Sequence, residues 1–144
     1  MMEPLSAADR LVNILLVEDD EVDVLNVRRA FAKHNITNPL FVAGNGVEGL
    51  EMLRSGAVPR SRRIILLDLN MPMMNGIEFL RALRADPELR PTPVVVLTTS
   101  NDERDRTEAY NLNVAGYILK PVTFMNFGEV MATLNKYWAL VELP

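Results

Sequence analysis

The fold is decided by one stretch of the sequence, Ile65-Leu66-Leu67-Asp68-Leu69-Asn70-Met71-Pro72-Met73-Met74-Asn75-Gly76. Its first three residues are apolar without alternation, which predicts a strand buried on both faces of a parallel sheet. The run ends at Asp68, and the proline and glycine beyond it indicate a loop. Parallel sheets place ligand sites at the ends of their strands, so Asp68 is a candidate site residue. The alternative is a carboxylate that caps the next helix.

Length and composition indicate one domain. The chain has 144 residues, of which 49% are hydrophobic and 24% charged, as in ordinary globular proteins. We assign residues 1–144 to a single domain with a core at about 11–137 and an apolar tail at 138–144. The net charge of −4 disfavours a nucleic-acid-binding surface.

Several classes of site are excluded by residue types that are rare or missing. The sequence has no cysteine and one histidine, His34, which excludes disulfides, thiolate catalysis, Cys-ligated zinc and Ser-His-Asp triads. No apolar run approaches the roughly 20 residues that span a bilayer. The first ten residues lack the apolar core of a signal peptide. We therefore expect a cytoplasmic protein without membrane contact.

Apolar runs alternate with helical patterns five times along the chain. Strands are expected at 11–17, 40–43, before Asp68, at 93–97 and within 113–119. Helices are expected after Asp20, at about 47–55, 76–83 and 103–110, and finally at 124–137. This alternation predicts an α/β fold with a parallel sheet between two layers of helices. Right-handed crossovers then favour a flavodoxin-like (βα)5 sandwich with strand order 2-1-3-4-5.

That topology brings polar residues from four strand ends to one edge of the sheet. Glu18 and Asp19 follow the first strand, Asp68 the third, Thr98 the fourth and Lys120 the fifth. Neighbouring carboxylates repel one another unless a cation lies among them, and oxygen ligands alone favour Mg²⁺. A lysine and a hydroxyl can hold phosphoryl oxygens, and an aspartate can form an acyl phosphate. The pattern therefore predicts Mg²⁺-dependent phosphoryl chemistry.

Each of these residues also has a plainer interpretation. Asp20 and Glu21 are expected to be only first-turn acids that complement a helix dipole. Lys120 could be a solvated lysine beside a turn proline, and Thr98 could be β-branched strand filler. It is their joint arrival at four strand ends that favours a site.

Four segments resemble the receiver domain of two-component response regulators. They are Leu15-Leu16-Val17-Glu18-Asp19-Asp20, the stretch from Leu67 to Gly76, Val95-Val96-Leu97-Thr98 and Gly116-Tyr117-Ile118-Leu119-Lys120-Pro121. The segments come in the family's order and at its spacing, and they cover nearly the whole chain. The resemblance, to CheY-like receivers, implies a signalling protein that is phosphorylated rather than an enzyme that turns over a substrate.

The resemblance assigns the phosphorylation site and its metal ligands. Asp68 would accept a phosphoryl group from a sensor histidine kinase and would later lose it by hydrolysis. Asp19 and Asp68 would bind Mg²⁺ directly, together with the backbone carbonyl of Asn70, and Glu18 would act through water.

Other positions match the family's switch and tuning residues. Thr98 and Lys120 would contact the phosphoryl group. Tyr117 matches the switch aromatic, which moves inward as Thr98 shifts toward the phosphate. Asn70 and Ser100 stand at the variable positions that tune the lifetime of the phosphoryl group.

Two further segments resemble stand-alone response regulators that partner phytochrome-type histidine kinases. One is the Arg-containing insertion Ser55 to Arg63, and the other is the ending Asn135 to Pro144. No DNA-binding domain follows the receiver pattern, so we expect a stand-alone receiver in a phosphorelay downstream of a phytochrome-like sensor kinase.

The chain ends with four large apolar residues that would expose much apolar surface if left free, namely Trp138, Leu140, Val141 and Leu143. They either fold back on their own domain or cover a second protomer beside the fourth and fifth helices. We favour a symmetric homodimer, because closed C2 pairs are the commonest oligomers. Truncation after Asn135 is then expected to leave a folded monomer.

Two other functions compete with the receiver interpretation. A haloacid-dehalogenase-like phosphatase also forms an aspartyl phosphate, but it pairs its nucleophile with an aspartate two residues on, where this chain has Asn70. A dimeric receiver scaffold that works without phosphorylation would not need the intact set of Glu18, Asp19, Asp68, Thr98 and Lys120.

Overall fold

A computed structural model of the chain describes residues 11–120, 124–140 and 143–144. Within them, five strands form one parallel sheet in the order β2-β1-β3-β4-β5. The strands are β1 (Asn13–Val17), β2 (Leu40–Ala43), β3 (Arg63–Leu67), β4 (Val94–Thr98) and β5 (Gly116–Leu119). The helices are α1 (Glu21–Lys33), α2 (Gly46–Ser55), α3 (Gly76–Ala85), α4 (Glu103–Asn111) and α5 (Phe124–Leu140). None of these helices is long and apolar enough to span a membrane.

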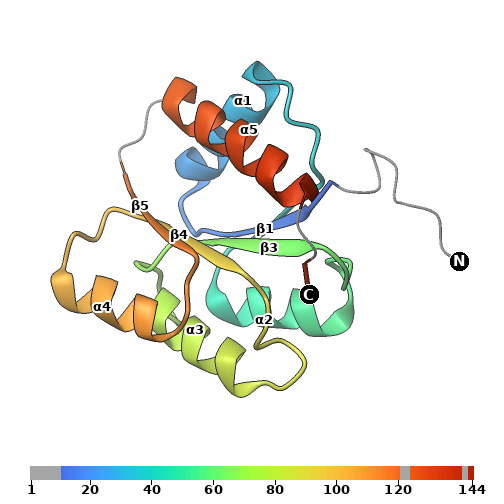
Figure 1. The fold of residues 1–144 in the computed structure, drawn as a ribbon. Helices are drawn as coiled ribbons and strands as arrows, with labels where there is room; N and C mark the ends of the chain where they lie inside the picture. Colours follow the sequence, from blue (N-terminus) through green and yellow to red (C-terminus); the bar gives the residue numbers. More distant parts are fainter. Residues whose placement is uncertain (1–10, 121–123, 141–142) are drawn as a thin grey trace, which may run out of the picture.

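The sheet is covered by helices on both faces. Helices α1 and α5 lie side by side on one face, and α2, α3 and α4 cover the other (Figure 1). A helix connects each strand to the next, as parallel strands require. This arrangement confirms the predicted flavodoxin-like (βα)5 fold, including its strand order.

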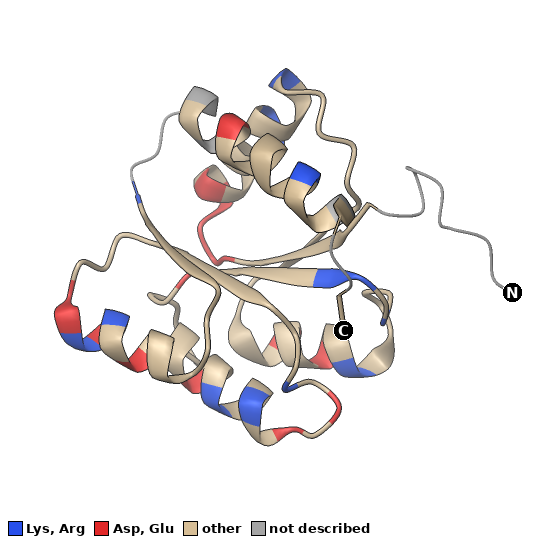
Figure 2. Ribbon diagram, in the orientation of Figure 1, with Lys and Arg blue, Asp and Glu red and all other residues tan. Residues whose placement is uncertain are grey.

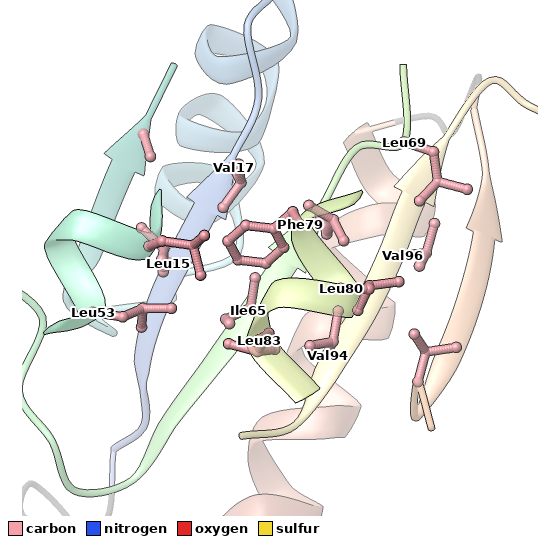
Figure 3. Close-up of a cluster of buried hydrophobic side chains, with 14 of the residues drawn as sticks. Leu15, Val17, Leu53, Ile65, Leu69, Phe79, Leu80, Leu83, Val94 and Val96 are labelled. Carbon is pink, nitrogen blue, oxygen red and sulfur yellow. The ribbon is translucent and has the colours of Figure 1, made fainter. Parts of the chain in front are cut away.

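Alternate residues of β3 pack on opposite faces of the sheet, which explains why the strand is apolar almost throughout. Ile64 and Leu66 join a cluster of buried side chains beneath α1 and α5. Ile65 and Leu67 join a larger cluster beneath α2, α3 and α4, where Figure 3 shows Ile65 beside Phe79 of α3. Burying each of these side chains stabilises the fold by about 1.5–3 kcal/mol.

Capping side chains set the starts of the helices. Glu21 lies in the first turn of α1, as the sequence predicts, whereas Asp20 directly precedes that turn and caps the helix. Asn75 forms a capping box with Glu78 at the start of α3, and Asp102 caps α4. Because these caps satisfy backbone N–H groups that have no partner inside the helix, they fix where each loop at the carboxyl edge of the sheet ends.

The last helix is longer than the sequence analysis predicts, since α5 ends at Leu140 rather than near Tyr137. Trp138 belongs to this helix, is only 7% exposed and packs in the cluster beneath α1 and α5. The predicted tail boundary at residue 138 is therefore wrong. The physical reason is visible in the sequence, because Met131, Leu134 and Trp138 recur at helical spacing and share one face.

The remaining residues of the predicted tail divide between core and surface. Leu143 is partly buried against the same cluster, whereas Leu140 is 84% exposed. Val141 lies outside the described residues. Arg62, in the loop before β3, donates a hydrogen bond to the backbone carbonyl of Trp138. At Trp138 and Leu143 the chain end thus folds back on its own domain.

Candidate functional site

Four polar side chains come from the carboxyl ends of four strands that lie at one edge of the sheet. Glu18 follows β1, Asp68 follows β3, Thr98 ends β4 and Lys120 follows β5. Figure 2 shows the acidic segment between β1 and α1 and the basic segment that directly follows β5 at this same edge. The edge is where sheets of this topology place their ligand sites.

Backbone hydrogen bonds of the sheet continue into the site and hold its residues in register. The backbone N–H of Asp68 donates to the carbonyl of Val17 at 3.0 Å, and that of Lys120 donates to the carbonyl of Thr98 at 2.8 Å. The backbone positions of Asp68 and Lys120 are therefore set by the sheet rather than by a free loop.

An acidic cluster lies at the centre of the site. Glu18, Asp19 and Asp68 each contribute a carboxylate oxygen, and these oxygens lie within 4.8 Å of one another. Glu18 and Asp68 are 3% and 5% exposed, whereas Asp19 is open to solvent. It is the only group of potential metal ligands of this kind in the described part of the chain. Its all-oxygen donor set suits a hard divalent cation.

Lys120 reaches into this cluster. Its Nζ atom donates hydrogen bonds to Oε2 of Glu18 at 2.7 Å and to Oδ2 of Asp23 at 2.8 Å, and it lies 4.0 Å from Oδ2 of Asp68. Asp23 is not among the site residues predicted from the sequence. The available signal was its place in the first turn of the helix that directly follows Glu18 and Asp19.

The protonation behaviour of the buried pair follows from these contacts. Burial raises the pKa of the Glu18 carboxyl from 4.5 to about 7, and the hydrogen bond from Lys120 offsets this only in part. The negative charge of Asp68 adds to the rise. Burial alone would lower the pKa of Lys120, but its hydrogen bonds to Asp23 and Glu18 outweigh burial and raise that pKa. Lys120 is therefore an ammonium at neutral pH.

The loops after β3 and β4 are tied to the site by local hydrogen bonds. The backbone N–H of Asn70 donates to Oδ1 of Asp68, and the Asn70 side chain donates to Oγ1 of Thr99, both at 3.2 Å. The fully buried Thr98 accepts from the backbone N–H of Ser100 with its hydroxyl, also at 3.2 Å. The two predicted tuning positions, Asn70 and Ser100, thus each bond to a side chain at a strand end.

Tyr117 on β5 is linked to the loop that follows Thr98. Its hydroxyl donates to the backbone carbonyl of Ser100 at 2.8 Å. The ring is partly buried, and the guanidinium of Arg106 lies over it, 5.5 Å from the ring centre. Ser100 in turn donates from its hydroxyl to Asp105 at 2.6 Å. Tyr117, Ser100 and α4 therefore form one connected group beside the site.

A family model, the response regulator receiver domain, matches residues 14–132. The chain belongs to this family. The matched segment begins in β1, ends in α5 and contains the whole edge described above, so the acidic cluster and Lys120 lie inside the receiver domain.

Two curated relatives of this receiver domain match over most of their length. The probable methanogenesis regulatory protein FilR2 of Methanothrix harundinacea is 35% identical, covering 93% of this chain and 87% of FilR2. The response regulator Rcp1 of Synechocystis is 34% identical, covering 91% of this chain and 92% of Rcp1.

Two solved structures share the fold of this receiver domain. The phosphorylated cyanobacterial phytochrome response regulator RcpA superposes with a TM-score of 0.78 at 33% identity, over 93% of this chain and 99% of RcpA. The Mn²⁺-bound form of Rcp1 superposes with a TM-score of 0.75 at 34% identity, over 92% of this chain and 99% of Rcp1. This chain therefore has phytochrome response regulators among its homologues.

Proposed function

We propose that this receiver domain accepts a phosphoryl group on Asp68 in a Mg²⁺-dependent reaction. The observation that carries the proposal is the arrangement around Asp68, a buried carboxylate within 4.8 Å of Glu18 and Asp19 and 4.0 Å from the Lys120 ammonium. Three clustered carboxylates lie beside a single lysine ammonium, so the cluster keeps an excess of negative charge that a divalent cation can offset. The arrangement suits a reaction in which a charged group arrives from solvent.

The donor set fits Mg²⁺, because three carboxylates converge and one of them, Asp19, is open to solvent. In our proposal Asp19, Asp68 and the backbone carbonyl of Asn70 hold the ion, and Glu18 holds one of its waters. When bound, Mg²⁺ would neutralise charge on the phosphoryl oxygens and on the carboxylates. The solved Mn²⁺-bound form of the relative Rcp1 supports a divalent cation.

The transfer forms one bond and breaks one. A carboxylate oxygen of Asp68 bonds to phosphorus, and the bond from phosphorus to the donor imidazole nitrogen breaks. The electron pair stays on that nitrogen, which takes up a proton. Lys120 and the Thr98 hydroxyl then contact phosphoryl oxygens. We propose that the protein turns over no external substrate, and that water later removes the phosphoryl group from Asp68.

The switch is proposed to run from Thr98 to Tyr117. The Thr98 hydroxyl accepts from the Ser100 backbone, and the Tyr117 hydroxyl donates to the carbonyl of the same residue. A shift of the Thr98 hydroxyl toward the phosphoryl group would therefore pull on the residue that anchors Tyr117. Asn70 and Ser100, which flank Asp68 and Thr98, would tune the lifetime of the phosphoryl group through the access of water.

The phosphoryl donor is proposed to be a sensor histidine kinase of the phytochrome type. The support is the set of relatives, which includes the phosphorylated phytochrome response regulator RcpA and a bacteriophytochrome response regulator at 36% identity. We also propose a homodimer that buries Leu140 on α5, because this large apolar side chain is 84% exposed in the single chain. Trp138 is not part of that surface, since it is buried in its own domain.

The test is labelling with a small phosphodonor, acetyl phosphate, read as intact protein mass. We expect the wild type to gain one phosphoryl group in the presence of Mg²⁺ and none in the presence of EDTA. Asp68→Asn, which keeps the size of the side chain but is a poor nucleophile, is expected to gain none. A wild type that binds Mg²⁺ without gaining mass would contradict the proposal and favour a receiver scaffold that works without phosphorylation.

A further inference from the structure

Three carboxylates face the Lys120 ammonium, and one of them, Asp23, lies outside the acidic cluster. Nζ donates to Glu18 and to Asp23 at 2.7 and 2.8 Å, but it is 4.0 Å from Asp68. The last distance is too long for a hydrogen bond. Lys120 is therefore anchored by Glu18 and Asp23 and only faces Asp68.

Asp23 is set in place by the start of α1. The carboxylate of Asp20 caps the helix and accepts from the backbone N–H groups of Val22 and Asp23, at 2.8 and 3.3 Å. The Asp23 side chain is 33% exposed, whereas that of Lys120 is 11% exposed. Asp23 thus reaches a largely buried ammonium from the rim of the site, on a helical turn whose backbone N–H groups are capped by Asp20.

An ammonium has three protons, and the anchors use two of them. The third is left for an acceptor on the side of Asp68. The oxygens of a phosphoryl group on Asp68 would lie farther from the backbone than the Asp68 carboxylate does. The 4.0 Å between Lys120 Nζ and Asp68 Oδ2, which is too long for a hydrogen bond, therefore leaves room for one of these oxygens. With Glu18 and Asp23 accepting two protons, the ammonium keeps one proton that can be donated to a phosphoryl oxygen.

We infer that Asp23 is a positioning residue, which holds the Lys120 ammonium where the phosphoryl oxygens arrive and so pre-organises the site for transfer to Asp68. The inference rests on the proposed function of Asp68. Asp23 acts through Lys120. A lysine side chain has many rotamers, so without this anchor the ammonium would spend less time in the productive position.

The negative charge of Asp23 has an opposite effect, since it repels an incoming phosphoryl group. That repulsion is weak, because the side chain is one-third exposed and water screens it. The anchor, in contrast, acts on a group that contacts the phosphoryl oxygens. We therefore expect loss of the anchor to outweigh loss of the repulsion. Asp23→Asn separates the two effects, because it removes the charge but keeps an oxygen acceptor.

The first test is the rate of labelling by acetyl phosphate at saturating Mg²⁺. In this reaction an Asp68 oxygen bonds to phosphorus and acetate leaves with its electron pair, so no proton moves. We expect Asp23→Ala to react about tenfold more slowly than wild type, and Asp23→Asn to stay within about threefold of it. The control is Glu21→Ala, which removes a solvent-exposed acid from the same helical turn as the partly buried Asp23 and should react at the wild-type rate. A wild-type or faster rate for Asp23→Ala would overturn the inference.

The second test needs neither Mg²⁺ nor phosphorylation. In EDTA, the ¹⁵N resonance of the Lys120 ammonium, assigned by its loss in Lys120→Arg, should show slow proton exchange in wild type and in Glu21→Ala. Exchange should be about tenfold faster in Asp23→Ala, because one of the two anchors is gone. Unchanged exchange would overturn the inference. If wild type shows no labelling at all, the proposed function fails, and the ammonium exchange still decides whether Asp23 anchors Lys120.

Discussion

The charge of Glu18 depends on pH near neutrality in the metal-free protein. Its folded-state pKa is about 7, above its ordinary value of 4.5, so folding favours the protonated form. The stability that Glu18 contributes is therefore fully present below pH 4.5 and is lost as the pH rises through about 7. This direction is opposite to that of a carboxylate whose pKa is lowered by a salt bridge.

The expected outcome is a pH-dependent difference between wild type and Glu18→Gln, which is neutral at every pH. In EDTA, the melting temperature of wild type should fall relative to that of Glu18→Gln by roughly 3 to 8 °C between pH 5 and pH 8. Thermal unfolding followed by circular dichroism measures this difference. Glu51→Gln, an exposed position on α2, is the control and should follow wild type at every pH. A difference that does not change with pH would contradict the raised pKa.

Some residues of the site can be predicted from the sequence more fully than others. Glu18, Asp68 and Lys120 could be predicted, because each directly follows an apolar run and the topology brings the strand ends together. Asp23 could be recognised only as an acid in the first helical turn after Glu18 and Asp19, because its contact with Lys120 depends on the direction of its side chain. A pattern of residue types contains no such direction.

At the scale of an element, the start of α3 lies unusually close to the loop of Asp68. A Cβ atom at Gly76 would lie 2.6 Å from the backbone carbonyl oxygen of Asp68 and 2.6 Å from the Cα of Leu69. Both are backbone atoms that cannot rotate away. The backbone N–H of Gly76 also donates to the carbonyl of Leu69 at 3.0 Å. Only a residue without a side chain fits here, so the start of α3 packs directly against the backbone of the loop that carries Asp68.

Gly76→Ala is therefore expected to push α3 away from the site loop. We expect it to lower the free energy of unfolding by about 1–3 kcal/mol and to slow labelling of Asp68. Urea unfolding and the acetyl phosphate assay measure these two effects. The control is Gly44→Ala, whose Cβ would lie 3.4 Å from the flexible end of Glu48 and should change stability by less than about 0.5 kcal/mol. A fully stable Gly76→Ala would show that the close approach is not needed.

Element boundaries are harder to predict from the sequence than element types. The apolar run at 11–17 predicts a strand, but β1 begins only at Asn13, because its partner β3 begins at Arg63 and offers no ladder before it. The predicted end of α5 comes too early, although Met131, Leu134 and Trp138 continue the helical pattern. A strand's length depends on its neighbour, which the local sequence does not specify. The signal for the helix end, in contrast, is present in the sequence itself.

At the scale of the whole molecule, the position of Trp138 changes the test of the proposed dimer. Truncation after Asn135 would remove this buried side chain and the carbonyl that accepts from Arg62. Removal of a buried tryptophan side chain costs about 3–5 kcal/mol. Truncation is thus expected to unfold the protein rather than to yield a folded monomer, contrary to the expectation from sequence.

Leu140→Glu is the sharper variant, because Leu140 is 84% exposed and contributes little to its own domain. We expect it to shift the proposed dimer toward monomer in light scattering, with the unfolding midpoint of the monomer unchanged. Thr37→Glu, at an exposed position in the loop between α1 and β2, adds the same charge elsewhere and should leave the dimer intact. A dimer of undiminished strength in Leu140→Glu would refute the proposed surface.

Trp138 also provides a spectroscopic opportunity. It is the only tryptophan in the chain, and Arg62, just before the start of β3, bonds to its carbonyl, whereas Asp68 follows the far end of that strand. Its indole fluorescence therefore originates at the end of the domain opposite the acidic cluster. The intensity and wavelength of this fluorescence should change when the cluster beneath α1 and α5 is lost on unfolding. Ions bound beside Asp68 should quench it little. The native chain thus carries an intrinsic fluorophore for folding measurements, with no label to attach.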